Sequence, residues 1–148
     1  MFITYGRSWR GSNEIRLREV AKRAGSKVRI VLPDYRDAEL LKHFSVRYRK
    51  TEEEVANLIK DAVKEYSDYF DEETCDFKLR LTKHPPTNGY YRFGNRQIIT
   101  LYNYNDQKGN IPVFVNKKPG RLFDFFDFEF DYLISSGSEP PTEEPTSR

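Results

Sequence analysis

The stretch that most constrains the fold is Lys27-Val-Arg-Ile-Val-Leu-Pro-Asp34. It is a short apolar run with β-branched residues, a helical pattern precedes it, and Pro33 closes it. Such a run is typical of a strand that is buried in an α/β sheet. Ligands of open α/β sheets bind beyond the carboxyl ends of the strands, so Asp34, just past this strand, is a candidate site residue.

The residues before this strand predict a strand and then a helix. Residues 2–5 form a candidate first strand, and a loop with two glycines follows over residues 6–11. Ser12 or Asn13 can cap the next helix, which has one apolar stripe, and Gly25 is placed to end it. Strand, helix and strand in this order predict a parallel pair with a right-handed crossover. The stripe consists of Leu17, Val20, Ala21 and Ala24.

Two more helices are predicted after the central strand. Asp37 can cap a short helix over residues 38–48. Thr51 and Glu54 match a capping box, in which the hydroxyl and the carboxylate each bind an end amide. The clearest helical periodicity of the chain then predicts a helix over residues 52–69. Its apolar positions are Val55, Leu58, Ile59, Ala62, Val63 and Tyr66.

In the second half the hydrophobic period changes to two, which predicts strands. A hairpin is expected where residues 90–93 and 97–104 flank a Gly94-Asn95 turn. Residues 112–115 predict an edge strand, because their proline cannot donate a ladder hydrogen bond. The half-buried strand before the hairpin has its apolar positions at Phe77, Leu79 and Leu81.

Residues 122–134 fit both an alternating strand and a helical stripe, and the lack of β-branched residues through Leu133 favours a helix. The sequence favours packing of this helix, whereas an exposed aromatic face on it would indicate a protein interface. A chain of 148 residues is expected to form one domain. We therefore predict an α/β domain over residues 1–134 and a disordered tail over 135–148, which is rich in proline, serine and acids.

Composition excludes several classes of protein. One cysteine, Cys75, excludes an internal disulfide and a thiolate zinc cluster. No run approaches the roughly 18 apolar residues of a membrane span, and the first residues do not match a signal peptide, so we expect a cytoplasmic protein without membrane contact. Residues 1–50 carry 13 basic and 5 acidic side chains (+8), and the remaining 98 residues carry 12 and 18 (−6). Either the basic half faces nucleic acid or an acidic partner, or the two halves pair their charges within the fold.

Several segments share an order with a known family: Gly25–Asp34, Tyr90–Tyr102, Pro112–Val115, Leu122–Phe126 and Glu129–Phe130. This order resembles one half of the phospholipase D-like fold. More narrowly it is similar to the non-catalytic phospholipase D-like domains of bacterial regulators and defence-associated proteins. The resemblance covers residues 2–134 and implies an α/β half-domain with a mixed sheet flanked by helices. Such domains usually accompany an output domain.

The chain departs from the catalytic pattern of that family. Catalytic members use His-x-Lys-x4-Asp, with the histidine as phosphate nucleophile and the lysine on a phosphate oxygen. His43 has Ser45 two places on, and His84 has Pro86, so neither begins the motif. The resemblance therefore implies a non-catalytic sensor or interaction domain that binds a nucleotide-like or phosphorylated ligand, or a partner protein. A divergent phosphodiesterase or nuclease is the alternative, but it would need a nucleophile and a base that the sequence does not show. His43 lies on a basic helix face and His84 in a proline loop, so neither stands out as a general base.

Five residues form the predicted ligand site: Arg7, Ser8 and Arg10 after the first strand, Asp34 after the second, and Arg92 on the hairpin. Arginines beside a glycine-flanked loop and a helix N-terminus suit a phosphate. The loop lacks the Lys-Ser/Thr of a phosphate-binding loop, so packing and salt bridges are the competing interpretation.

Two other kinds of site compete with this one. Aromatic residues interleaved with Arg92 and Arg96 would stack bases if the chain bound nucleic acid, with an affinity that falls steeply with salt. Core packing and cross-strand pairing are the alternative for them. Asp34 with Asp37, or the acids of 68–73, would hold a cation, but no histidine has ligand spacing, so we expect neither metal nor cofactor. The aromatic residues are Tyr90, Tyr91, Phe93, Tyr102 and Tyr104.

Overall fold

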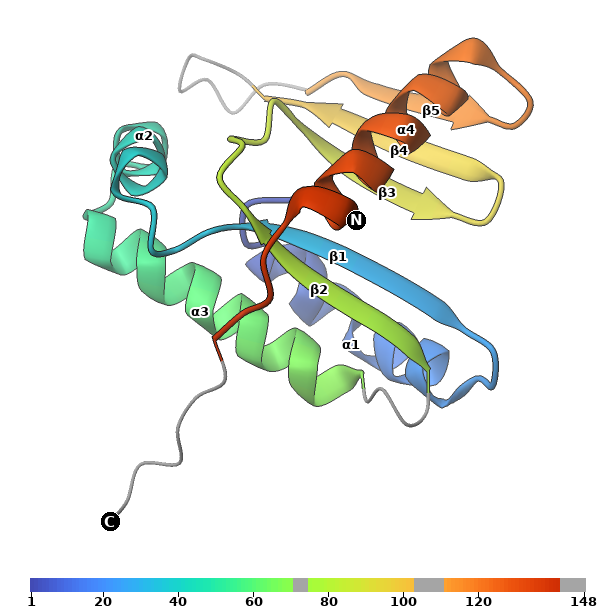
Figure 1. Cartoon of the computed structure of the whole chain (residues 1–148), viewed down its shortest axis with the longest axis horizontal. Coiled ribbons are helices and arrows are strands. Elements are labelled where there is room, and N and C mark those ends of the chain that lie inside the picture. Colours follow the sequence, from blue (N-terminus) through green and yellow to red (C-terminus); the bar gives the residue numbers. More distant parts are fainter. Residues whose placement is uncertain (71–74, 103–110, 142–148) are drawn as a thin grey trace.

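The computed structural model describes residues 1–70, 75–102 and 111–141. These residues form a mixed α/β fold with four helices and two small sheets, one parallel and one antiparallel (Figure 1). In chain order the elements are α1 (Arg7–Lys22), β1 (Lys27–Pro33), α2 (Ala38–Tyr48), α3 (Glu52–Tyr69), β2 (Asp76–Thr82), β3 (Asn88–Phe93), β4 (Arg96–Leu101), β5 (Val113–Lys117) and α4 (Arg121–Ser136).

Phe2 joins the two sheets. β1 pairs with β2 in parallel, and β3, β4 and β5 form an antiparallel meander. Phe2 bridges Val31 of β1 in parallel and Tyr90 of β3 in antiparallel. Its amide donates to the Tyr90 carbonyl oxygen at 2.9 Å, and the Tyr90 amide donates back at 2.9 Å. The spatial order is therefore β2, β1, Phe2, β3, β4, β5, and the predicted strand over residues 2–5 shrinks to this bridge.

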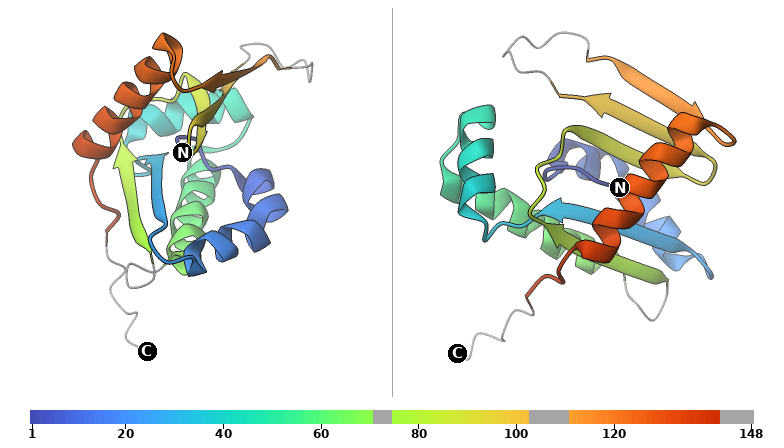
Figure 2. Two further views of the ribbon diagram at one scale, coloured as in Figure 1. Left: turned by 90° about the vertical axis from the view of Figure 1, so that its right-hand side faces the viewer. Right: turned by 45° about the horizontal axis from the view of Figure 1, so that its top comes forward.

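The two faces of the sheet carry two separate cores. Figures 1 and 2 show α1 and α3 on one side of the sheet and α4 on the other. Along β1, Ile30 and Leu32 pack with the side chains of α2 and α3, whereas Val31 packs with Phe130 of α4. The three β1 residues Ile30, Val31 and Leu32 are each at most 1% exposed. The prediction that residues 27–34 contain a buried strand of an α/β sheet is confirmed.

Helices α2 and α3 begin as their capping residues predict. The Leu40 amide donates to the Asp37 side chain at 3.1 Å. The Glu54 amide donates to Thr51 Oγ1, while the Thr51 amide donates to the Glu54 carboxylate, so the capping box is complete. Four residues of α3 are buried, and each belongs to the predicted stripe: Val55, Ile59, Ala62 and Tyr66.

Helix α1 differs from its prediction. It begins at Arg7, without a side-chain cap, after Gly6 in the left-handed region (φ 55°). The predicted loop over residues 6–11 and the predicted caps at Ser12 and Asn13 are therefore wrong. The predicted stripe holds in part: Ala21 is buried and Leu17 packs on the core, but Val20 and Ala24 are exposed. The added first turn buries Arg10, which sets the face that α1 turns toward α3. Ala24 lies beyond the helix, because α1 ends at Lys22 with Arg23 as its C-cap rather than at Gly25.

The second half of the chain follows its pattern closely. The hairpin and its Gly94-Asn95 turn are confirmed, although β4 ends at Leu101, and residues 103–104 lie outside the described residues. β5 lies at the outer end of the meander, as its proline predicted. The helix over residues 122–134 is confirmed as α4.

Regular structure continues beyond the predicted start of the tail at residue 135. α4 reaches Ser136, and Ser138 pairs with Leu81 of β2. Residues 142–148, the rest of the predicted tail, lie outside the described residues. Among the helices that the structure describes, none has both the length and the apolar character needed to cross a membrane.

Candidate functional site

Arg10 is a structural residue between α1 and α3. Its side chain is 2% exposed, and Nε donates to Glu65 Oε2 at 2.7 Å. The guanidinium lies 5.4 Å from the Tyr66 ring centroid and also donates to the Tyr5 carbonyl oxygen. The hydrogen bond from Arg10 lowers the pKa of Glu65. Arg7 and Ser8, one turn earlier, are exposed.

Asp34 finds its partner two residues away. The carboxylate accepts from the Arg36 amide at 3.0 Å and from Nε and Nη2 of Arg36 at 2.8 Å each. The hydrogen bond from the Arg36 side chain lowers the pKa of Asp34, although burial opposes it. Asp34 is 4% exposed, so this local pair neutralises a carboxylate that the fold has taken out of water.

Arg92 lies on the α4 side of the sheet. It donates to Asp127 of α4 and to the Gly94 carbonyl oxygen, and it lies 5.3 Å from the Phe123 ring centroid. Arg10, Asp34 and Arg92 thus belong to three ion pairs on different elements. Among the described residues, no hydrogen bond or ion pair joins any two of the five predicted site residues. A phosphate would bind Arg10 or Arg92 only after the arginine had left its carboxylate.

A cavity of about 560 Å³ does lie at the carboxyl ends of β1 and β2. Three of its lining residues are acidic and two are basic, a net charge of −1. Asp37 is also committed to the α2 cap. An anionic ligand is therefore disfavoured at this cavity, despite its position at the strand ends. Its charged residues are Asp34, Arg36, Asp37, Glu39 and Lys83.

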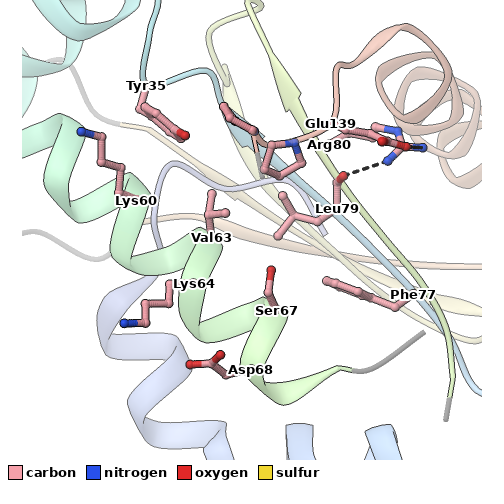
Figure 3. Close-up of a pocket in the computed structure, with 12 residues that line it drawn as sticks. Tyr35, Lys60, Val63, Lys64, Ser67, Asp68, Phe77, Leu79, Arg80 and Glu139 are labelled. Carbon is pink, nitrogen blue, oxygen red and sulfur yellow. Dashed lines mark hydrogen bonds and ion pairs between the residues drawn. The ribbon is translucent and has the colours of Figure 1, made fainter. Parts of the chain in front are cut away.

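A second cavity, of about 690 Å³, lies between α3 and β2 (Figure 3). Val63 of α3 and Phe77 and Leu79 of β2 supply its apolar wall. Glu139, from the segment after α4, accepts from Arg80 Nη2 at 3.1 Å at one end. The sequence pattern did not indicate this groove, because periodicity does not tell which strand lies at the edge of a sheet.

Helix α4 has two apolar stripes. Its inner stripe, with Phe123 and Phe130 buried, covers the sheet. Its outer stripe is exposed by 50 to 74% and consists of Leu122, Phe125, Phe128 and Tyr132. These positions follow one another at intervals of three or four residues, so they share one face of the helix. Packing and exposure, the two alternatives for this segment, therefore both occur, one on each face.

Most of the aromatic residues that were candidates for stacking on bases pack inside the fold. Tyr90 is 3% exposed and stacks on Phe130, and Tyr91 lies 5.3 Å from the Trp9 ring. Tyr102 lies beneath the Arg47 guanidinium at 4.0 Å. These aromatics therefore pack within the fold, Phe93 is exposed, and Tyr104 lies outside the described residues.

The structure also places the two histidines, the acidic residues that were considered as metal ligands, and the oppositely charged halves of the chain. The His84 ring lies 6.0 Å from the Tyr132 ring, and His43 packs against Phe44. In the described residues, no group of three or more His, Cys, Asp or Glu side chains is placed to hold a metal, and residues 71–73 of the acidic run lie outside them. The ion pairs Arg10–Glu65 and Arg29–Asp76 join the basic half to the acidic half.

Comparison of the chain with family models gives no match, and no curated protein or solved structure matches it either. Its function is therefore inferred from the chemistry of the surfaces described above.

Proposed function

We propose that this chain is a non-catalytic interaction domain that binds a partner protein through the outer face of α4. The observation that carries the proposal is the exposed stripe of Leu122, Phe125, Phe128 and Tyr132. Aromatic side chains dominate the energetics of protein interfaces, and contiguous exposed apolar patches mark interaction sites. The absence of a His-x-Lys-x4-Asp motif supports a role without phosphodiesterase chemistry, as does the resemblance to non-catalytic phospholipase D-like domains.

The charges beside the stripe define the partner. α4 carries acids next to the aromatic face, with Arg121 as its one basic residue. A second copy of α4 would bring like charges together, which disfavours pairing of two such helices. The complementary partner is an amphipathic helix with an apolar face and a basic rim, which would lie along α4 as helices lie against grooves and faces in other complexes. The acids beside the stripe are Asp124, Glu129 and Asp131, whereas Asp127 pairs with Arg92 on the inner side of α4.

The test uses two fluorescent helical peptides of equal length, one of leucine and lysine and one of leucine and glutamate, with binding measured by anisotropy. The leucine–lysine peptide should bind the wild-type protein, and Phe128→Ser should weaken binding about 30-fold, the effect of losing an interface aromatic. Phe128 is 74% exposed, so its replacement should leave the fold intact.

The matched control is Ile15→Ser on α1, because Ile15 is 76% exposed and lies on a different helix. Equal binding by the Phe128→Ser and Ile15→Ser variants would refute the assignment of α4. If both peptides bound with the same affinity, the proposal that the partner helix carries a basic rim would be refuted. A wild-type protein that forms dimers which Phe128→Ser abolishes would instead assign this face to a second copy.

The second candidate function is a sensor for a nucleotide-like or phosphorylated ligand. Its supporting observation is the first turn of α1, which has neither a side-chain cap nor an acidic residue, and which carries exposed Arg7 and Ser8. Helix N-termini of this kind attract phosphates. A thermal-shift screen with nucleotides and short nucleic acids at two salt concentrations tests it. A shift that survives salt and disappears in Arg7→Ala would support the sensor, and a shift lost in salt would indicate nucleic acid.

A further inference from the structure

Among the described residues, no strand pairs with the outer edge of β2 at Phe77 and Leu79. Thr82 and Asp76 turn their backbone groups toward β1, since the Thr82 carbonyl accepts from the Asp34 amide at 2.8 Å and the Asp76 amide donates to Ser26 at 2.9 Å. Leu81 turns the other way, toward Ser138. Backbone groups alternate along a strand, so those of Leu79 and Phe77 face the same outer edge as those of Leu81. The Phe77 amide donates locally, to the Cys75 carbonyl oxygen at 2.8 Å, and an added strand would replace this bond.

The chain's own last described segment already occupies one end of this edge as a strand would. The Leu81 amide donates to the Ser138 carbonyl oxygen at 2.7 Å, and the Ser138 amide donates back at 2.9 Å. This bridge is antiparallel. Continued in the same register, residue 140 would lie opposite Leu79. Residue 140 is a proline, which has no amide hydrogen to donate, so the ladder stops there. The Leu79 carbonyl oxygen instead accepts from the Arg80 side chain at 3.0 Å (Figure 3).

The side chains along this edge alternate in character. Phe77 and Leu79 point toward α3 and form the apolar wall of the 690 Å³ groove. Lys78 and Arg80 lie on the opposite face of β2, as alternation requires. The antiparallel register places residue 139 opposite Arg80, and Glu139 does form an ion pair with it at 3.1 Å. The same register places residue 141 opposite Lys78, where this chain has Pro141 rather than an acid.

We propose that the outer edge of β2 binds an extended acidic segment of a partner protein by strand addition. The segment would run antiparallel to β2, with apolar side chains in the groove beside α3 and acidic side chains on Arg80 and Lys78. It would displace Glu139, Pro140 and Pro141, which lie along this edge and cannot extend the pairing themselves. Strand addition takes affinity from main-chain hydrogen bonds and specificity from alternate side chains. The site lies at the sheet edge beside α3, so it is independent of the outer face of α4.

The test uses fluorescein-labelled Ser-Glu-Val-Glu-Val-Thr peptides and anisotropy with the full chain. One peptide is unmodified, one is N-methylated at both valines, and one is N-methylated at both glutamates. In the proposed register the valine amides face β2 and the glutamate amides face away. The unmodified and glutamate-methylated peptides should bind, and methylation of the valines should abolish binding. Equal binding by all three peptides, or binding by none, would overturn strand addition.

Protein variants test the charges and the competition. Lys78→Glu should weaken binding about fivefold, the scale of exposed ion pairs, whereas Lys42→Glu, the same charge change on exposed α2, should leave it unchanged. Glu139→Ala should strengthen binding about two- to fivefold, since it removes the competing ion pair. Equal losses in the two lysine variants would overturn the charge assignment, and an unchanged affinity in Glu139→Ala would overturn the competition.

Discussion

The Arg10–Glu65 pair yields a quantitative prediction, because its two members differ so much in exposure. The Arg10 side chain is 2% exposed and the Glu65 side chain is 44% exposed. Glu65→Ala leaves a buried guanidinium without its carboxylate. Arg10→Met instead removes the buried charge and fills part of its volume, while the carboxylate of Glu65 can turn to water. We therefore expect the less buried partner to be the more costly one to remove.

The magnitudes follow from burial. Loss of the carboxylate from a buried pair costs about 3–5 kcal/mol, and access of water at the Glu65 end places Glu65→Ala near the lower limit, at about 3 kcal/mol. Arg10→Met should cost about 1–3 kcal/mol, mainly the unpaired Tyr5 carbonyl oxygen. In the Arg10→Met background Glu65 becomes an ordinary surface residue, so Glu65→Ala should then cost less than about 0.5 kcal/mol. The coupling free energy in the double-mutant cycle is therefore about 2.5 kcal/mol.

Urea unfolding of the four proteins, followed by circular dichroism at neutral pH, measures the cycle. With a slope of about 2 kcal/mol per molar urea, a coupling of this size corresponds to a midpoint difference of roughly 1.2 M. The slopes must agree among the four proteins for the free energies to be compared. If Glu65→Ala costs the same in both backgrounds, Arg10 is not held in the core by Glu65 and the reasoning fails.

Two further predictions concern the cap of α3 and the carboxylate after β1. Thr51→Ala should lower the free energy of unfolding by about 1 kcal/mol, since it removes the hydroxyl half of the capping box, and an unchanged urea midpoint would contradict this role. Arg36 lowers the pKa of Asp34, so the stability that Asp34 contributes should be present above its unfolded pKa of 3.8 and be lost as pH falls through the folded value. The stability difference between wild type and Asp34→Asn should therefore be constant near neutrality and shrink below about pH 4, and a constant difference at all pH values would exclude the ion pair as its source.

Local signals account for the parts of the fold that the sequence predicts well. Asp37 and the Thr51–Glu54 box act within a few residues, so α2 and α3 begin where expected. The Gly94 turn sets the hairpin for the same reason, since Gly94 adopts a φ of 59°. The start of α1 could not be predicted this way, because it is fixed by contacts of Arg10 with a residue 55 positions away.

In the candidate site, too, the features set by local sequence were predictable and those set by distant contacts were not. The position of Asp34 after β1 was predictable, but its pairing with Arg36 rather than with a ligand was not marked by any pattern. Arg92 meets an acid 35 residues further along the chain, and only the packing of α4 brings the two together. The sequence did offer an exposed aromatic face on α4 as an alternative, because a helix with apolar residues on more than one face cannot bury them all against one sheet.

The bridging position of Phe2 has a consequence for folding during synthesis. Phe2 leaves the ribosome well before its hydrogen-bond partner Tyr90, which is made 88 residues later. At a synthesis rate of about 5–20 residues per second, Tyr90 is made roughly 4–18 s after Phe2, so the bridge between them cannot form before then. β1 can accept the segment earlier, through the bond from the Val31 amide to the Met1 carbonyl oxygen. We therefore expect residues 1–3 to assemble in two stages, with the two sheets joined only after the hairpin has formed.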